Sequence, residues 1–295
     1  MINDAPEWAS LGWRLLLLGL IPLLLFAENL APRHPDHLRR GRRWINNLLL
    51  ALSSWWFGRE VLLLATAGMV WWLGSAPRGL LALVPLPAVI SLCLSLLAID
   101  LFEYLLHRLY HRVPLLWRLH RVHHSDTRVD VTTTLRQHPL GALVDVPLRL
   151  GAWWLLGAAP QVVLLYQLIA LAVHLFNHVN WQLPAAIERR LRGWLVTPDF
   201  HVVHHSRDRI ETDSNYGSVL PWWDYLFATA QVRDAAVCRS LVLGLDEFRA
   251  DRDLWLPQLL GQPFQTMSRA GLGRGGLLTG RPSVRLSRQG QPDPE

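Results

Sequence analysis

Ten of the thirteen histidines in this chain fall into four short boxes whose spacing suits metal binding. The boxes read HRLYH, HRVHH, HLFNH and HVVHH, and their histidines are His107, His111, His120, His123, His124, His174, His178, His201, His204 and His205. Side chains three or four residues apart share one face of a helix, so each box can present two or three imidazoles to one point. Neutral imidazole binds Zn, Fe, Cu and Ni. Since one ion takes about four to six ligands, ten histidines predict a site for two ions.

The chain offers no other obvious metal or redox motif. Cys93 and Cys238 form no CxxC pair, so neither a cysteine zinc site nor a disulfide framework is expected. The remaining histidines are His34 and His37, which we interpret as ordinary loop residues, and His138, which precedes a proline. The chemistry is therefore expected to lie in the four boxes.

Polar residues near the boxes could orient the imidazoles. Asp100 and Glu103 precede His107 by seven and four positions, which places them on its face of a helix. Carboxylates commonly accept the second N–H of a metal-bound imidazole, while the alternative for these acids is pairing with Arg108 or Arg112. Weaker candidates for the same supporting role are His138, Asn177, Asn180, Asp213 and Asn215.

Five apolar stretches must carry the boxes. They cover residues 13–26, 45–73, 86–106, 143–156 and 162–176, and the second contains Arg59 and Glu60. A helix needs about 20 residues at ~1.5 Å each to cross a membrane, and the first three stretches are long enough. The last two are short and are split by Gly157 and Pro160, so they predict a hairpin that either spans or only enters the membrane.

Composition favours a membrane protein. Hydrophobic residues make up 51% of the chain, mean hydropathy is +0.18, and 15 tryptophans, which favour membrane interfaces, outnumber 5 tyrosines. All 29 basic residues are arginine, which excludes a lysine Schiff base and a P-loop. The net charge is +6, and the arginines lie beside apolar runs. Anionic lipid headgroups are therefore expected as partners and nucleic acid is not.

The arginines also predict an orientation. The segment 33–43 holds five of them and the segment 74–85 holds only Arg78, so the first is expected in the cytoplasm and the N-terminus outside. The third helix then returns to the cytoplasm near His107, and the hairpin brings His174 to the same side. All four boxes are predicted at one cytoplasmic membrane surface.

These observations predict an all-α fold. We expect a polytopic membrane bundle of about four spanning helices plus a short hairpin, with a cytoplasmic histidine-rich helical cap. One domain is expected over residues 1–264, with its motif core at about 86–229, followed by a disordered basic tail at 265–295 that is rich in Gly, Arg, Ser and Pro. The alternative, a soluble helical bundle, would have to cover too many apolar runs.

The order HxxxH, HxxHH, HxxxH, HxxHH resembles the fatty acid hydroxylase and sterol desaturase superfamily, over roughly residues 86–229. HRVHHS at 120–125, NYG at 215–217 and WDYLF at 223–227 strengthen the resemblance. It implies two Fe ions held by the ten box histidines, with zinc possible in isolated protein, and O2 as co-substrate. It also implies hydroxylation or desaturation of a sterol or fatty acyl lipid in the bilayer.

Three further points bear on function. The sequence has no Rossmann, flavin or CxxCH haem motif, so electrons are expected from a separate donor, a cytochrome b5-like protein or a ferredoxin with its reductase. A hydrolytic metalloenzyme stays open as an alternative, although HExxH is absent and no box holds a glutamate between its histidines. A non-enzymatic membrane metal-binding protein also stays open.

Overall fold

The computed structural model describes residues 11–12, 14–34, 40–73 and 79–266, and these residues form helices and loops without a β-strand. The all-α prediction is confirmed. The longer helices are α2 (Ile21–Leu30), α3 (Arg40–Leu73), α4 (Ala88–Arg112), α5 (Pro114–His124), α6 (Ala142–Leu156) and α7 (Pro160–Asn177). The shorter ones are α8 (Ala185–Leu191), α9 (Pro198–His204), α10 (Arg209–Thr212), α11 (Trp222–Leu226), α12 (Ala235–Ser240) and α13 (Leu256–Gly261). Most of the predicted tail, His37 and Arg78 lie outside the described residues.

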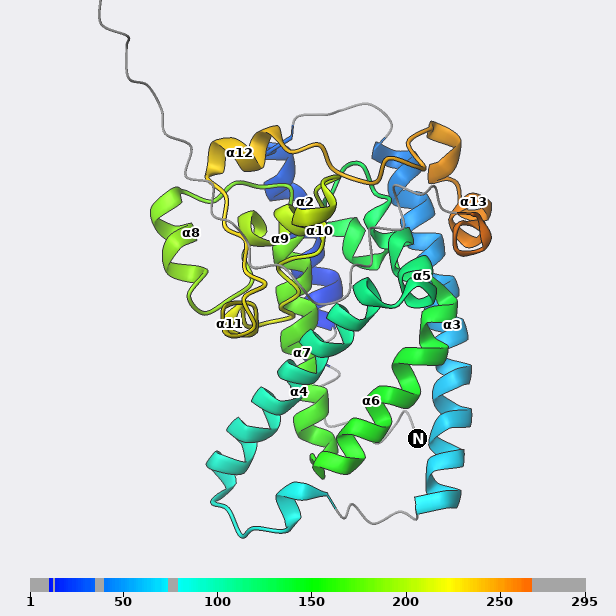
Figure 1. The fold of residues 1–295 in the computed structure, drawn as a ribbon, viewed down its shortest axis with the longest axis vertical. Coiled ribbons are helices and arrows are strands. Elements are labelled where there is room, and N and C mark those ends of the chain that lie inside the picture. Colours follow the sequence, from blue (N-terminus) through cyan, green and yellow to red (C-terminus); the bar gives the residue numbers. More distant parts are fainter. Residues whose placement is uncertain (1–10, 13, 35–39, 74–78, 267–295) are drawn as a thin grey trace, which may run out of the picture.

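The helices form two regions that follow one another along the long axis of the molecule. Helices α3, α4 and α6 extend toward one end, where the short 3-10 helix Leu80–Ala82 lies, whereas α8, α9, α10, α12 and α13 gather toward the other end (Figure 1). A buried apolar core that includes Ile99, Val173 and Phe200 joins α4, α7 and α9. The short helices are thereby held against the ends of the long ones.

Three described helices are long and apolar enough to cross a membrane: Arg40–Trp71, Ala88–Arg112 and Pro160–Asn177. Large side chains of the first, such as Trp55 and Leu64, are exposed, as a lipid-facing surface requires. This count is lower than the predicted four spans plus a hairpin. The described part of the first apolar stretch forms a shorter helix, Leu18–Leu30. In the hairpin, α7 reaches spanning length while α6 has only 15 residues.

Proline and glycine set the ends of the helices that carry the boxes. Pro114 restricts Val113 to an extended conformation, so α4 ends at Arg112 and α5 starts a new direction at once. Gly157 takes a left-handed φ of 73° after α6, and Pro160 starts α7. The break that the sequence predicted at these two residues is confirmed. Because of the turn at Val113, the first two boxes lie on adjacent helices rather than along one.

Two carboxylates hold the loop between α10 and α11. Asp100 on α4 accepts hydrogen bonds from the amides of Val219 and Leu220 and from the Trp223 indole. Asp224 accepts from the amides of Tyr216 and Gly217. The loop is thus fixed to α4 at the level of the first box.

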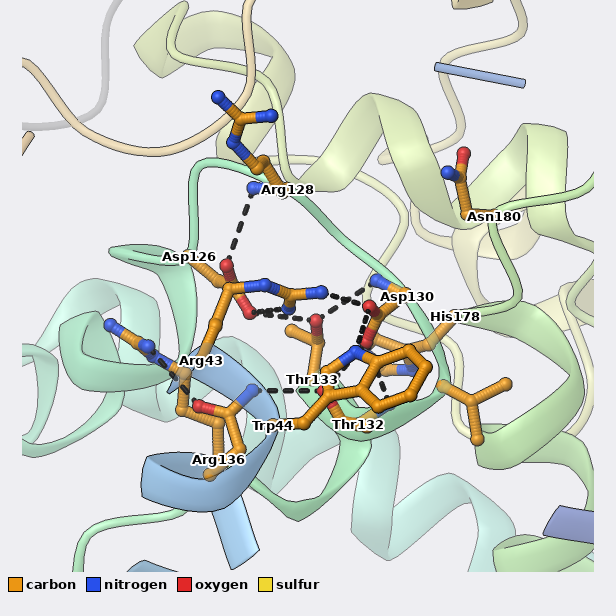
Figure 2. Close-up of polar contacts among 12 residues, drawn as sticks. Arg43, Trp44, Asp126, Arg128, Asp130, Thr132, Thr133, Arg136, His178 and Asn180 are labelled. Carbon is orange, nitrogen blue, oxygen red and sulfur yellow. Dashed lines mark hydrogen bonds and ion pairs between the residues drawn. The ribbon is translucent and has the colours of Figure 1, made fainter. Parts of the chain in front are cut away.

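A buried polar network fastens the segment after α5 to the start of α3. Arg43 donates to Asp126 over 2.8 Å and also to Asp130, as Figure 2 shows. Arg136, which is fully buried, donates to the Val122 carbonyl and to Asn47. The loop that leaves the second histidine box is therefore held from both sides by arginines.

Candidate metal centre

Nine of the ten box histidines form two groups. The ring nitrogens within each group lie within 4.8 Å of one another. The first group contains His107, His111, His120, His124 and His204, and the second contains His123, His178, His201 and His205. Rings of the two groups are neighbours, since His124 and His205 stack with centroids 4.8 Å apart. The structure therefore presents two adjacent sites, each large enough for one ion.

Helix geometry explains how the first two of the four boxes supply these groups. His107 and His111 are four residues apart and project from the last turns of α4 into the first group. On α5, His120 and His124 share that direction, whereas His123, one position earlier than His124, turns toward the second group.

The fourth box divides in the same way around the end of α9. His204 enters the first group, while His201 and His205 enter the second. The third box contributes His178, the residue that ends α7. Both HxxHH boxes thus bridge the two sites, and each site is built from helices that are distant in sequence.

Distances between ring nitrogens fit metal coordination. The Nε2 atoms of His107 and His120 are 3.1 Å apart, and Nε2 of His178 lies 3.1 Å from that of His201 and 3.2 Å from that of His123. Ligands at ~2.0–2.1 Å from one ion and at right angles are ~2.9 Å apart, so these nitrogens are at coordinating separation. Buried Nε2 atoms of His111, His124 and His204 also have no hydrogen-bond partner among the described residues. All three belong to the first group, so one ion there would satisfy them.

Burial keeps these imidazoles in the form that binds metal. Loss of water around the ring lowers the pKa of His120, His123, His124, His201, His204 and His205 well below the usual value. The same cause lowers the pKa of His178 to about 3. At neutral pH all seven rings are therefore uncharged, and a neutral ring offers a lone pair to a cation.

Acceptors behind the rings fix their direction. Nδ1 of His107 lies 2.9 Å from the Tyr216 carbonyl, and Nδ1 of His204 lies 2.6 Å from that of Ser214. Nδ1 of His111 lies 3.2 Å from a carboxylate oxygen of Asp213. A proton on each Nδ1 leaves Nε2 free to face the site. Sequence reasoning missed the two carbonyls because every residue has one; only the fold, which fixes the loop from Asp213 to Gly217, selects them.

The predicted supporting residues divide into those that touch a box histidine and those that do not. Asp213 contacts a box histidine, His111. The two acids on α4 bind elsewhere: Asp100 fastens the loop before α11, and Glu103 pairs with Arg149 rather than with Arg108 or Arg112.

The amides and His138 mainly connect segments of backbone. Asn180 bonds to the backbone of His34, and Asn215 donates to the Phe200 carbonyl from a left-handed conformation with φ of 52°. His138 accepts from the Leu140 amide and bonds to the Leu260 carbonyl. The amide of Asn177 is buried without a hydrogen-bond partner in the described part of the chain.

His174 lies outside both groups. Its Nε2 is 3.0 Å from the hydroxyl of Ser218, and its carbonyl accepts from Nδ1 of His178. It nevertheless lines the same cavity as five histidines of the groups, so it faces the site without joining either cluster in this structure.

A cavity of about 320 Å³ opens beside the two groups. Its apolar wall includes Leu106 and Leu171, and its polar wall includes a half-buried ion-pair cluster. The polar wall includes Glu103, Tyr110, Asp145 and Arg149. The histidines that line the cavity are His107, His120, His123, His138, His174, His178 and His201. A small molecule in this cavity would contact both groups.

Comparison with known proteins agrees with this site. The fatty acid hydroxylase family model matches residues 92–229, which contain all four boxes. An ornithine lipid hydroxylase of Rhizobium tropici is 33% identical over 48% of this chain and 42% of its own. Human alkylglycerol monooxygenase is 30% identical over 52% of this chain and 34% of its own, and methylsterol monooxygenase 1 of Danio rerio is 28% identical over 48% of each.

These matches cover well under two thirds of each relative, and no solved structure matches the chain. The relatives are lipid hydroxylases and monooxygenases by name, and the shared part is the part that carries the histidines. Apolar helices of spanning length and the family match together show a membrane protein. The resemblance that the boxes predicted is confirmed: residues 92–229, which carry the four boxes, match the fatty acid hydroxylase family and are similar to lipid hydroxylases and a methylsterol monooxygenase.

Proposed function

We propose that the protein is a membrane-bound iron oxygenase that hydroxylates or desaturates a lipid of the sterol or fatty acyl type with O2 and external electrons. The observation that carries this proposal is the pair of adjacent groups of buried, neutral imidazoles beside one cavity. Related hydroxylases and monooxygenases favour hydroxylation over desaturation.

The proposed ligands are the ten box histidines, and the proposed cofactor is two iron ions, one in each group. The five-histidine group and the four-histidine group each fit one ion by distance. His174 lines the same cavity and is proposed as the tenth ligand. We assign it to the smaller group because it lies four residues before His178 in the third box. Zinc, which also binds imidazole, can replace iron in isolated protein.

The roles of the residues follow from the site. Iron, when bound, supplies the O2 chemistry that an unactivated C–H bond requires. The protein holds the ions by rings whose direction is fixed from behind, as the Tyr216 and Ser214 carbonyls do for His107 and His204. Burial of these rings keeps water from the site. The cavity wall holds one carbon of the substrate next to the histidines.

Electrons and orientation complete the proposal. The donor is a separate protein, a cytochrome b5-like protein or a ferredoxin with its reductase, since the sequence has no motif for a flavin, nicotinamide or haem group. The histidine-bearing end is placed on the cytoplasmic side. Support comes from Arg40, Arg42 and Arg43, which begin α3 at that end, because arginines accumulate on the cytoplasmic side of membranes.

Turnover by purified protein tests the proposal. Iron-loaded protein in lipid nanodiscs, with a competent reductase and donor, is expected to give an O2-dependent lipid product that gains one atom from 18O2 or loses two hydrogens. His204→Ala, which removes a ligand of the five-histidine group, is expected to abolish the product. His34→Ala, a histidine outside both groups, is the matched control.

Two outcomes would favour the alternatives. Protein that binds two irons yet forms no O2-dependent product with sterol, glycerolipid or fatty acyl substrates would support a metal-binding role without catalysis. A product that forms equally well without O2 and contains a cleaved ester or amide would support a hydrolytic enzyme.

A further inference from the structure

The polar wall of the cavity is an ion-pair cluster that the metal site does not use. Arg149 on α6 donates to both oxygens of Glu103 on α4, over 2.8 Å each. Its third nitrogen lies 3.4 Å from Asp145, whose other oxygen accepts from the Tyr110 hydroxyl over 2.7 Å. All four side chains line the cavity together with the histidines. Whatever occupies the cavity therefore meets this cluster.

The arginine in this cluster is already engaged. A guanidinium recognises a carboxylate or a phosphate through two parallel N–H groups, and on Arg149 that edge is occupied by Glu103. An anionic ligand would have to displace Glu103 and leave it unpaired in a half-buried wall. The cluster is thus a poor receptor for a free carboxylate or a phosphate.

The acids, in contrast, have capacity left. A carboxylate can accept about four hydrogen bonds, and Glu103 and Asp145 each receive two from the cluster. Two carboxylates against one guanidinium also give the wall a formal charge of −1. Both features favour a ligand group that donates hydrogen bonds, and favour it further if that group is positively charged.

The cluster lies close to the metal groups. Glu103 and His107 are four residues apart on α4, so they occupy one face one turn apart, at ~5–6 Å between their Cβ atoms. The Tyr110 ring, which joins Asp145, is 5.5 Å from the His120 ring. A head group bound by the cluster would therefore leave only the first few carbons of its chain beside the histidines.

We propose that the lipid which occupies this cavity carries a hydrogen-bond-donating head, a hydroxyl or an ammonium group, which Glu103 and Asp145 accept. This inference rests on the proposed function, because it takes the cavity to be the substrate site. It assigns Glu103 and Asp145 as specificity-determining residues, and it excludes a free fatty acid as the preferred substrate.

Equilibrium binding to the metal-free protein tests the inference without turnover and without bound cations, which would themselves attract the carboxylate probe. Three saturated probes of one chain length are compared in neutral detergent at neutral pH: a primary alcohol, a primary alkylammonium and a carboxylate. The alcohol and the ammonium are expected to bind at least about tenfold more tightly than the carboxylate, a difference of ~1.4 kcal/mol. Carboxylate binding as tight as that of the alcohol would overturn the inference.

Asp145→Asn is the informative variant because the amide oxygen still accepts from Tyr110 and the Arg149–Glu103 pair stays intact. It neutralises the wall, so the advantage of the ammonium over the alcohol is expected to fall about tenfold while alcohol binding stays near that of wild type. Asp246→Asn removes an exposed acid outside the cavity and is the matched control, with no expected change. An unchanged order of affinities in Asp145→Asn would contradict the role of the acid.

Binding and turnover separate this inference from the proposed function. If the predicted order of affinities holds but iron-loaded protein forms no O2-dependent product, the proposed function fails and the binding preference stands. If product forms and the carboxylate is the best ligand, the function stands and the inference fails.

Discussion

Single residues decide how the histidines are shared between two ions. In each HxxHH box, the three rings divide between the two groups, because neighbouring positions on a helix point in directions ~100° apart. One short box therefore ties both sites together, which four separate ligand pairs could not do. A shift of one of these helices would therefore change the coordination of both ions.

Asp213 gives a test of ring orientation. Asp213→Asn weakens the acceptor for Nδ1 of His111, so metal affinity is expected to fall by ~10–100-fold, measured by competition with a chelator. Arg209→Gln is the control: it removes the ion pair with Asp213 and a hydrogen bond to the His111 backbone carbonyl, but leaves the carboxylate next to the His111 ring. An equal loss of affinity in both variants would show that the ion pair, and not the contact with His111, matters.

His174 gives a test of the tenth ligand. If it binds iron, His174→Ala should reduce metal affinity by more than the ~10–100-fold that loss of a supporting contact costs, and elemental analysis should show loss from one site. Ser218→Ala removes only the hydroxyl that His174 contacts here and is expected to retain both ions. Full metal content in His174→Ala would reduce the ligand set to nine.

The structure brings nine of the ten predicted box histidines together. The sequence can indicate them because their signal is local: residue type plus a spacing of three or four. It could not predict the partners of the nearby acids. Asp100 lies on the same helical face as His107, yet the fold brings the Val219 amide and Trp223 to it. Those partners are more than a hundred residues away, and helical periodicity carries no information about them.

At the scale of elements, the start of α3 stabilises the segment that follows the second histidine box. Its first turns supply Arg43, which contacts Asp126 and Asp130 (Figure 2). They also supply Asn47, which donates to Thr132. The sequence interpretation treated this arginine-rich segment as a determinant of membrane orientation. It could not show that Arg43 is buried, because a surface arginine and a buried arginine look alike in sequence.

Removal of the Arg43 ion pairs is expected to lower the stability of the protein strongly. Arg43→Met leaves the buried carboxylates of Asp126 and Asp130 without their main cation, which is expected to cost ~3–5 kcal/mol and to lower the thermal unfolding midpoint in detergent. Arg42→Met, at an exposed neighbour that contacts the Trp255 ring, is the matched control and should change stability by less than ~1 kcal/mol. Similar midpoints for the two variants would argue against this role of Arg43.

Helix boundaries were predictable where Pro or Gly marks them: Gly157 follows the end of α6 and Pro160 starts α7. The number of spans was not. Apolar length predicted the first stretch as a span, but in the described residues it is a short helix, and α6 carries Asp145 and Arg149 where the hairpin was expected to be apolar. Asp145 and Arg149 line a protein cavity next to α4, so these charged side chains face protein and not lipid.

At the scale of the whole molecule, the account places the histidine-bearing end on the cytoplasmic side. Starting from a variant without Cys93 and Cys238, Ser240→Cys lies near that end and Leu83→Cys lies in the segment between α3 and α4; both positions are exposed. A membrane-impermeant maleimide applied to intact cells is expected to label Leu83→Cys and to reach Ser240→Cys only after lysis. The opposite labelling pattern would reverse the proposed orientation.

The central claim is that the two groups of imidazoles each hold one metal ion. Anomalous diffraction at the iron edge from crystals of the iron-loaded protein tests it directly and requires no substrate. The account predicts two peaks, one among His107, His111, His120, His124 and His204 and one among His123, His178, His201 and His205. A single peak, or iron bound away from these rings, would contradict it.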